Sequence, residues 1–295
     1  MTNEVDDGSD ENPINDDDNI EFTGAATELE WMDQPRHEEI FRDIEEQINS
    51  GHAKTPDRSG RKVLDSVFDH STLMAIYKMM QDGVIEQLNH PIARGKEAHV
   101  YHATGPQGAM AVKIFHTTNA VFKNLLKYIE GDPRFTGLKR KHRDLVTIWV
   151  RKEMRNLIRM HREGVRVPEP ISAYQNVLVM NFLGEGGRAA PQIRHVELEN
   201  PEAVVIDLSN MLRLIWQKSE LAHADFSEYN ILWHLDEPWI IDVGQAVSGR
   251  HPRAEEYLVR DIEKLHTWAN RQGVMIPLED IVLHVVDQEG MGWDV

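Results

Sequence analysis

The most constraining feature of the sequence is residues 223–230, which read His-Ala-Asp-Phe-Ser-Glu-Tyr-Asn and are followed twelve residues later by Asp242, after the apolar pair Ile240-Ile241. Phosphoryl transfer needs a carboxylate that orients or deprotonates the acceptor, and oxygen ligands for the metal that neutralises phosphate charge. Asp225 is the candidate base, and Asn230 and Asp242 are the candidate metal ligands. A turn or a helix cap explains each residue taken alone, but the combination favours a phosphotransferase.

A lysine and a glutamate upstream match the same chemistry. Ala111-Val112-Lys113-Ile114 resembles the V-A-I-K strand, which directs a lysine at nucleotide phosphates. Strand lysines are usually exposed, so burial of Lys113 requires a carboxylate partner. Glu153 is the best candidate, because it lies on a segment with helical periodicity about forty residues further along. Taken alone, Glu153 fits equally well as a surface residue in a salt bridge.

A candidate phosphate loop, Gly95-Lys96-Glu97, precedes the β-rich run 99–103. Neither G-x-G-x-x-G nor a Walker A motif is present. A single glycine before a strand is more often a plain turn, so this loop is a weak signal.

The pattern along the chain predicts an α+β fold with strands first and helices later. Runs 99–103 and 110–115 indicate a hairpin, 146–163 a helix, 177–182 a buried strand, 204–218 a helix, and 231–233 with 239–241 a short β-pair. Two short helices are expected from Val63 to Met80, the second capped by Ser71 and ended by Gly83. The expected division is an acidic disordered tail at 1–55, an N-terminal part with extra helices, a β-rich lobe and a hinge at 56–182, and a mainly helical lobe at 183–295.

Charge is distributed unevenly along the chain. Residues 1–50 carry 17 acids against two arginines, which accounts for −15 of the net −17, and such a segment buries too little apolar surface to order itself. Segment 123–166 carries 13 Lys and Arg against 5 Asp and Glu, a local +8, which is typical either of a polyanion-binding surface or of a solvated helix face. The chain has no cysteine and no long apolar run, so we expect a cytoplasmic protein without a membrane span.

Several blocks together resemble the Rio atypical protein kinases, and most closely the type 1 branch found in archaea. They occur in order over about residues 60–270 and read Gly-Lys-Glu-Ala, Ala-Val-Lys, Lys-Glu-Met-Arg-Asn-Leu, Pro-Glu-Pro, Leu-Val-Met-Asn-Phe-Leu-Gly, His-Ala-Asp-Phe-Ser-Glu-Tyr-Asn and Ile-Ile-Asp-Val-Gly-Gln. Two departures are that Ala93-Arg94 replace the usual Ser-Thr before Gly95, and that Asp-Val-Gly replaces the common Asp-Val-Ser.

The resemblance implies a trimmed two-lobed kinase fold that binds ATP and Mg²⁺, or Mn²⁺ in its place. It implies that Gly95, Lys96 and Glu97 cover the phosphates. Lys113 would then bind the phosphates, and Glu153 would pair with Lys113. Asp225 becomes the catalytic aspartate, and Asn230 and Asp242 bind the metal, with Asp242 also able to accept the phosphoryl group. Adenine would bind the backbone of the hinge at Met180, Phe182 and Leu183.

The resemblance further implies a serine/threonine kinase with ATPase activity, acting in maturation of the small ribosomal subunit. Its partner would be the pre-small-subunit particle. The chain would contact proteins of this particle and, through segment 123–166, its rRNA. Neither DNA nor a membrane is expected as a partner. Two alternatives stay open. One is a small-molecule kinase of the antibiotic-phosphotransferase type, which uses the same H-x-D-x-x-x-x-N pattern, and the other is a binding factor whose ATP turnover times its release from the particle.

Overall fold

The computed structural model describes residues 69–117, 125–135, 142–287 and 291–293. The predicted acidic tail at 1–55 and the predicted helix that begins at Val63 lie outside these residues. Among the described helices, none is both long and apolar enough to cross a membrane.

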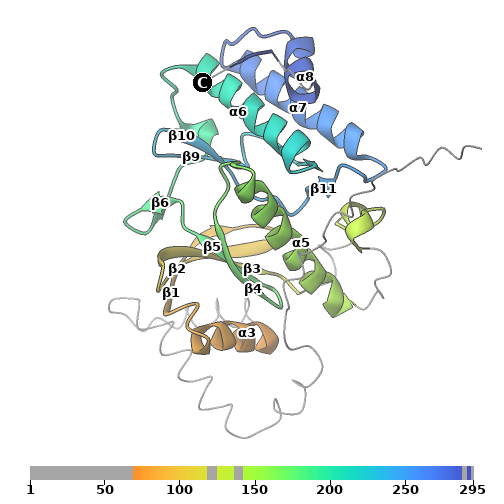
Figure 1. Cartoon of the computed structure of the whole chain (residues 1–295). Coiled ribbons are helices and arrows are strands. Elements are labelled where there is room, and N and C mark those ends of the chain that lie inside the picture. The colour runs from red at the N-terminus through yellow and green to blue at the C-terminus, as the bar shows by residue number, and fades with distance from the viewer. Residues whose placement is uncertain (1–68, 118–124, 136–141, 288–290, 294–295) are drawn as a thin grey trace, which may run out of the picture. The chain divides into compact units, whose positions relative to one another are not determined.

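A five-stranded antiparallel sheet, in the order β1-β2-β3-β5-β4, dominates the first half of the described chain (Figure 1). β2 and β3 form the predicted hairpin, paired from Ala98 with Phe115 to Gly105 with Gly108. β5 pairs with the other edge of β3, so β3 is the central strand, and its last six residues are buried. The strands are β1 (Gln87–Arg94), β2 (Ala98–Gly105), β3 (Gly108–Phe115), β4 (Pro170–Tyr174) and β5 (Val177–Asn181).

Helix α3 (His70–Gln81) precedes the sheet and contacts β5. The predicted cap Ser71 is wrong, because Asp69 caps the helix and its Oδ1 accepts the Thr72 N–H at 2.8 Å. A carboxylate at this position also accepts the Ser71 hydroxyl at 3.0 Å, so Ser71 supports the cap rather than forming it. The helix ends at Gln81, and Gly83 follows with a φ of 72°, as expected of a glycine just past a helix end.

Helix α5 (His142–Arg162) contains the predicted helical segment and contacts both β4 and β5. Trp149, Val150 and Leu157 on it are almost completely buried. Burial of this apolar face holds the helix beside the strands, and so determines where its polar residues lie relative to β3. Between β3 and α5 lie two short 3-10 helices, η1 (Leu126–Tyr128) and η2 (Pro133–Phe135).

The second half of the described chain is mainly helical, as predicted. Helix α6 (Pro201–Arg213) continues into the π-helical turn η4 (Leu214–Lys218), and α6, α7 (Ala254–Arg271) and α8 (Leu278–Val286) contact one another. The predicted β-pair is present as β9 (Ile231–His234) and β10 (Glu237–Ile240). The other short elements are β6 (Gly184–Glu185), β7 (Arg188–Ala189), η3 (Ile193–His195), β8 (Leu221–Ala222) and β11 (Val247–Ser248).

The arrangement is the expected two-lobed, kinase-like α+β fold, with an antiparallel sheet and the helices α3 and α5 in the first part and mainly helices in the second. The boundary that we placed between residues 182 and 183 stays a prediction. What matters for function is that β3, α5 and the turns around β8 to β11 converge on one set of polar side chains.

Candidate active site

Lys113, Glu153 and Asp242 form a cluster of one ammonium and two carboxylates, which we call the lysine–carboxylate cluster. Lys113 Nζ donates to Glu153 Oε1 at 2.6 Å and to Asp242 Oδ1 at 2.9 Å. Lys113 comes from the central strand, Glu153 from α5 and Asp242 from the turn after β10. Three segments far apart in sequence therefore meet at one amino group, and the predicted contact between Lys113 and Glu153 is present.

Electrostatics in this cluster favour a charged lysine. Burial alone would lower the pKa of the Lys113 ammonium, but Asp242 and Glu153 raise it above its usual value. Burial raises the pKa of Glu153 to about 7, and the Lys113 charge limits that rise. Burial also acts to raise the pKa of Asp242, yet the Lys113 charge and hydrogen bond lower it overall. The cluster thus keeps a permanent cation beside the Asp242 carboxylate.

Asp225 lies at the centre of a second set of contacts, the aspartate cluster, together with Asn230, Gln245 and Lys264. Asn230 Nδ2 donates to the Asp225 carbonyl oxygen at 2.9 Å and to Asp225 Oδ2 at 3.1 Å. Gln245 Nε2 also donates to Oδ2, at 3.2 Å, and Lys264 Nζ donates to Oδ1 at 3.1 Å. These donors fix the carboxylate of Asp225 in one orientation, which suits a group that must position an acceptor.

The predicted metal ligands retain oxygen atoms that suit a divalent cation. The amide nitrogen of Asn230 faces Asp225, which leaves its Oδ1 as the ligand atom, and Asp242 retains Oδ2 because Lys113 occupies Oδ1. Among the described residues no group of three His, Asp or Glu side chains is arranged to hold a metal. A cation here would be held by a mixed pair of Asn and Asp oxygens, completed by phosphate oxygens and water, which is the usual arrangement for Mg²⁺.

The predicted phosphate loop lies in the turn between β1 and β2. Gly95 N donates to the Ala98 carbonyl oxygen at 2.9 Å, and His116 N donates to the Glu97 carbonyl oxygen at 2.9 Å. Lys96 is exposed. Burial raises the pKa of the Glu97 carboxyl, and the nearby charges of Asp242 and then Asp225 raise it further. Glu97 is therefore within electrostatic range of Asp242 and Asp225, whereas its neighbour Lys96 is exposed to solvent.

The predicted hinge spans the end of β5, which contains Met180, and the residues Phe182 and Leu183 that follow it, and part of its backbone is already bonded. Phe182 N donates to the Ala109 carbonyl oxygen at 3.3 Å, and the Leu183 carbonyl oxygen accepts Ala190 N at 2.9 Å. Met180 and Leu183 are buried. The adenine contacts that the resemblance implies would use the other backbone groups of this segment.

A buried polar network, which we did not predict from the sequence, joins α5 to the turn that follows Asp242. Lys152 is completely buried, and its Nζ donates to the Gly244 carbonyl oxygen at 2.7 Å and also to that of Ala246. Asn156 Nδ2 donates to the carbonyl oxygens of Val243, at 2.8 Å, and Ala246, at 3.0 Å. We call these four bonds the α5–turn bonds. They hold the backbone of the turn that carries Asp242 against α5.

Helix α7 supports the aspartate cluster in a similar way. Asp261 is completely buried and accepts Ala224 N at 2.7 Å and Phe226 N at 3.0 Å. Burial raises the pKa of Asp261 to about 7, and the two N–H donors limit that rise. Ala224 has a φ of 67°, an unfavourable conformation for a residue with a Cβ. The bonds to Asp261 on both sides of Asp225 therefore stabilise a strained turn.

His223, the first residue of the motif, is structural in this arrangement. It is completely buried, and burial lowers its pKa to about 4. Its Nδ1 accepts Asp225 N at 3.3 Å. A neutral imidazole at this position helps to fix the turn that presents Asp225.

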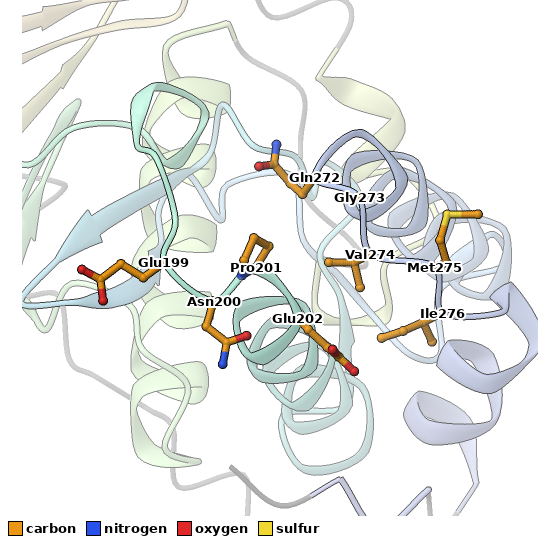
Figure 2. A pocket seen from close by; sticks show the side chains of 9 residues that line it. All are labelled: Glu199, Asn200, Pro201, Glu202, Gln272, Gly273, Val274, Met275 and Ile276. Carbon is orange, nitrogen blue, oxygen red and sulfur yellow. The ribbon is translucent and has the colours of Figure 1, made fainter.

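Two pockets lie away from both clusters. One, of about 430 Å³, lies between the start of α6 and the connection from α7 to α8. Figure 2 shows the side chains that line it, including the carboxylates Glu199 and Glu202 and the apolar Val274, Met275 and Ile276. The other, of about 270 Å³, borders the hinge at Phe182 and Leu183 from the side of Trp239. Neither pocket is lined by a member of the two clusters.

The fold and the site define a class of protein. A sheet with a buried lysine on β3, a helix that pairs this lysine with a glutamate, and an Asp–Asn–Asp set after the hinge are the parts of the protein-kinase-like fold. A profile of the RIO domain matches residues 99–281. The chain belongs to the RIO domain family.

Comparisons with individual proteins agree with this assignment. The chain is 38% identical over 276 residues to the RIO-type serine/threonine-protein kinase Rio1 of Haloferax volcanii, and the match covers 92% of this chain and 95% of that protein. It is 38% identical over 225 residues to human serine/threonine-protein kinase RIO1, covering 75% of this chain but only 40% of the human protein. The expected resemblance to the archaeal type 1 branch is therefore confirmed.

Solved structures support the fold. The Rio2 kinase–ADP/Mg²⁺–phosphoaspartate complex of Chaetomium thermophilum matches with a TM-score of 0.56 at 21% sequence identity, covering 76% of this chain and 69% of that one. A second structure of the same Rio2 kinase matches with a TM-score of 0.55 at 24% identity, covering 75% of this chain and 70% of that one. At this identity the likeness concerns the fold.

Proposed function

We propose that the chain is an ATP-dependent phosphotransferase, an atypical serine/threonine protein kinase that also hydrolyses ATP. The observation that carries the proposal is the amino group of Lys113, held within 2.9 Å of both Glu153 and Asp242, together with the carboxylate of Asp225 held by Asn230, Gln245 and Lys264. Relatives at 38% identity are named serine/threonine-protein kinases. This favours a protein acceptor over the small-molecule substrates of antibiotic phosphotransferases.

In the proposed reaction, the chain transfers the γ-phosphoryl group of ATP to a hydroxyl oxygen. The bond from the γ-phosphorus to the bridging oxygen breaks and its electron pair stays on ADP, while a new bond forms to the acceptor oxygen. The acceptor's proton passes to Asp225, which also orients that oxygen in line. Lys113 binds phosphate oxygens. Mg²⁺ or Mn²⁺, held by Asn230 and Asp242, supplies neutralisation of phosphate charge when bound.

Asp242 supports a second route, in which it serves as the acceptor itself. Its Oδ1 is held by Lys113 at 2.9 Å, so the other carboxylate oxygen can attack the γ-phosphorus while the bond from that phosphorus to the bridging oxygen breaks and ADP leaves. The acyl phosphate so formed is then hydrolysed by water to inorganic phosphate and the free carboxylate. The Rio2 structure of similar fold is described as a complex with phosphoaspartate. This route would make the chain an ATPase that needs no protein acceptor. Such an activity would suit a binding factor whose ATP turnover times its own release from a particle.

We further propose that the chain works in the cytoplasm on the pre-small-ribosomal-subunit particle, with segment 123–166 contributing to rRNA contact. The structure reduces the charge that this segment can offer. Lys152 is completely buried, and Arg134 pairs with Asp132 at 2.7 Å. Arg159 pairs with Glu220 at 2.8 Å. Residues 123–124 and 136–141 of this segment lie outside the described chain, so support for RNA binding still comes from the count of charges.

The test is incubation with radiolabelled ATP, with and without small-subunit particles, following label on protein and in free phosphate. Asp225→Ala should lose rate by about 10²–10⁴-fold, because positioned proton transfer contributes that much, while nucleotide affinity changes by less than about tenfold. Lys113→Ala should reduce both. An Asp225→Ala protein that loses ATP binding but keeps its residual turnover would show that Asp225 is a structural cap.

The chemical stability of the label separates the two routes. Label on Asp242 should be released by hydroxylamine and be absent from Asp242→Ala, whereas label on a serine or threonine should resist it. Undiminished metal-dependent turnover in Asp242→Ala would rule out both roles proposed for this residue.

A further inference from the structure

One turn of α7 faces the segment that carries Asp225. Arg260 donates to the Ala224 carbonyl oxygen, Asp261 accepts the N–H groups of Ala224 and Phe226, and Lys264 Nζ lies 3.1 Å from Asp225 Oδ1. Residues 260, 261 and 264 are spaced i, i+1 and i+4, so the last lies one turn above the first. The buried end of this face anchors the turn, and its outer end bears an ammonium group.

Anchoring of α7 does not require Lys264. The three bonds of Arg260 and Asp261 already hold the turn to the helix, and they are made to its backbone. The Lys264–Asp225 pair is about one third exposed on both side chains, 36% and 33%. Ion pairs at this exposure contribute little to stability, because water screens them and ordering two side chains costs entropy. The position of the ammonium group therefore calls for another explanation.

The charges around the site supply one. The charges of Asp242 and Asp225 both act on the Glu97 carboxyl, and the ammonium of Lys113 is shared between two carboxylates. A transferring phosphoryl group spreads negative charge over its three equatorial oxygens. On the side of Asp225, where the acceptor oxygen would lie, Lys264 is the cation that the structure brings into direct contact with the carboxylate.

We propose that Lys264 is a further catalytic residue, which binds the γ-phosphoryl group during its transfer while remaining paired with Asp225. The inference rests on the proposed function. An ammonium has three N–H donors, so a bond to Asp225 Oδ1 leaves donors for a phosphoryl oxygen. Pairing with Asp225 aims the amino group in advance, which avoids the cost of reorganisation during the reaction. No proton moves from Lys264, and its contribution is electrostatic.

The experiment compares Lys264→Met with the parent, using turnover and the binding of ADP alone and of ADP with magnesium and aluminium fluoride, which mimics a phosphoryl group in transit. We expect kcat to fall by about 10²-fold, at the lower end of the loss for one preorganised donor. Affinity for ADP–aluminium fluoride should fall by a similar factor, while affinity for ADP stays within about threefold. Lys264→Arg should recover most of both losses, because it keeps the charge.

Arg271→Gln is the matched control. Arg271 also lies on α7, and its Nη2 pairs with Glu228 of the same catalytic segment at 2.9 Å, so the variant removes a positive charge and an ion pair from the same helix without touching Asp225. It should behave like the parent in all three measurements.

Two results would overturn the inference. One is parent-like binding of ADP–aluminium fluoride by Lys264→Met, and the other is an equal loss in Arg271→Gln, which would show that α7 anchoring is the cause. A parent protein that neither turns over ATP nor binds ADP–aluminium fluoride would refute the proposed function itself, and that outcome is read from the parent alone.

Discussion

Lys152→Met is a direct test of the α5–turn bonds. The substitution keeps the length of a buried side chain but removes the donors to the carbonyl oxygens of Gly244 and Ala246. Leaving a buried acceptor unpaired costs about 1–3 kcal/mol. The substitution removes the donor to the Gly244 carbonyl oxygen, whereas the Ala246 carbonyl oxygen still accepts from Asn156. Removal of a buried amine offsets part of this loss. We expect the free energy of unfolding to fall by about 1–2 kcal/mol, and ATP turnover to fall with it because the Asp242 turn loosens.

The difference should also depend on pH, with a defined sign. Burial, and then the charge of Arg134, lower the pKa of Lys152 well below its ordinary 10.5. Between the lowered pKa and 10.5, the unfolded chain holds a proton that the folded chain has released. The parent therefore gains stability as pH rises, by at most about 1.4 kcal/mol per pH unit. The methionine variant lacks this gain, so the gap between them should be wider at pH 9 than at pH 7.

Urea unfolding followed by circular dichroism measures both effects. Lys78→Met is the control, because Lys78 forms an i,i+4 pair with Asp82 in which both side chains are nearly half exposed, at 45% and 48%. Such pairs contribute about 0.3–0.5 kcal/mol. The reasoning is refuted if Lys152→Met is as stable as Lys78→Met, or if its deficit narrows as pH rises.

Two further predictions concern groups behind the site. In Gly244→Ala the new Cβ would lie 2.9 Å from Glu153 Oε2 and 3.0 Å from Trp149 Nε1, so we expect a loss of about 1–3 kcal/mol in thermal unfolding together with weaker nucleotide binding in calorimetry; unchanged binding would show that Glu153 can move aside. For Asp261→Asn, the raised pKa of about 7, against an ordinary 3.8, means that the folded parent keeps a proton that the unfolded chain has lost. The parent's advantage in unfolding free energy should therefore be larger at pH 5 than at pH 8, and a constant difference would contradict this.

The central strands and the lysine–glutamate pair could be predicted because each depends on a local pattern. An apolar run with β-branched residues indicates β3, and helical periodicity indicates α5. Given these two elements, Lys113 needs a carboxylate and Glu153 is the one that a helix can supply. The short pair β9 and β10 was predictable for the same reason, since the turn residues between its strands are typical of a hairpin.

Within the five-stranded sheet, the two strands that we did not predict, β1 and β4, are its edges. β1 contains Pro91, where its pairing with β2 is irregular, and β4 begins with Pro170. Proline removes a donor and is tolerated only where a strand has one partner or a bulge. The sequence pattern therefore predicts loops at these positions. Only the folded sheet shows that β1 pairs with β2 and that β4 pairs with β5.

The supports of the aspartate cluster could not be predicted from sequence. Lys264 and Asp261 lie 39 and 37 residues beyond their partners Asp225 and Ala224, on a helix whose charged face resembles any solvated surface. Only the packing of α7 against the motif distinguishes them. Lys152 is the opposite case, since it sits beside Glu153 in a block that we had singled out, but a charged residue in a helix gives no sign that it will be completely buried.

The α5–turn bonds carry a consequence for how such an enzyme could be controlled. In kinases generally, activity follows the placement of the helix that bears the glutamate, and a helix that swings provides an off state. Here Lys152 and Asn156 join that helix to the turn carrying Asp242 through four buried hydrogen bonds, and a swing would have to break them all. Because the helix stays in its active position, the binding-competent conformation is always populated, and the apparent affinity for nucleotide is not reduced by a competing inactive conformation. A signal that silences this chain would have to act on access to the site or on the departure of product, leaving the helix where it is.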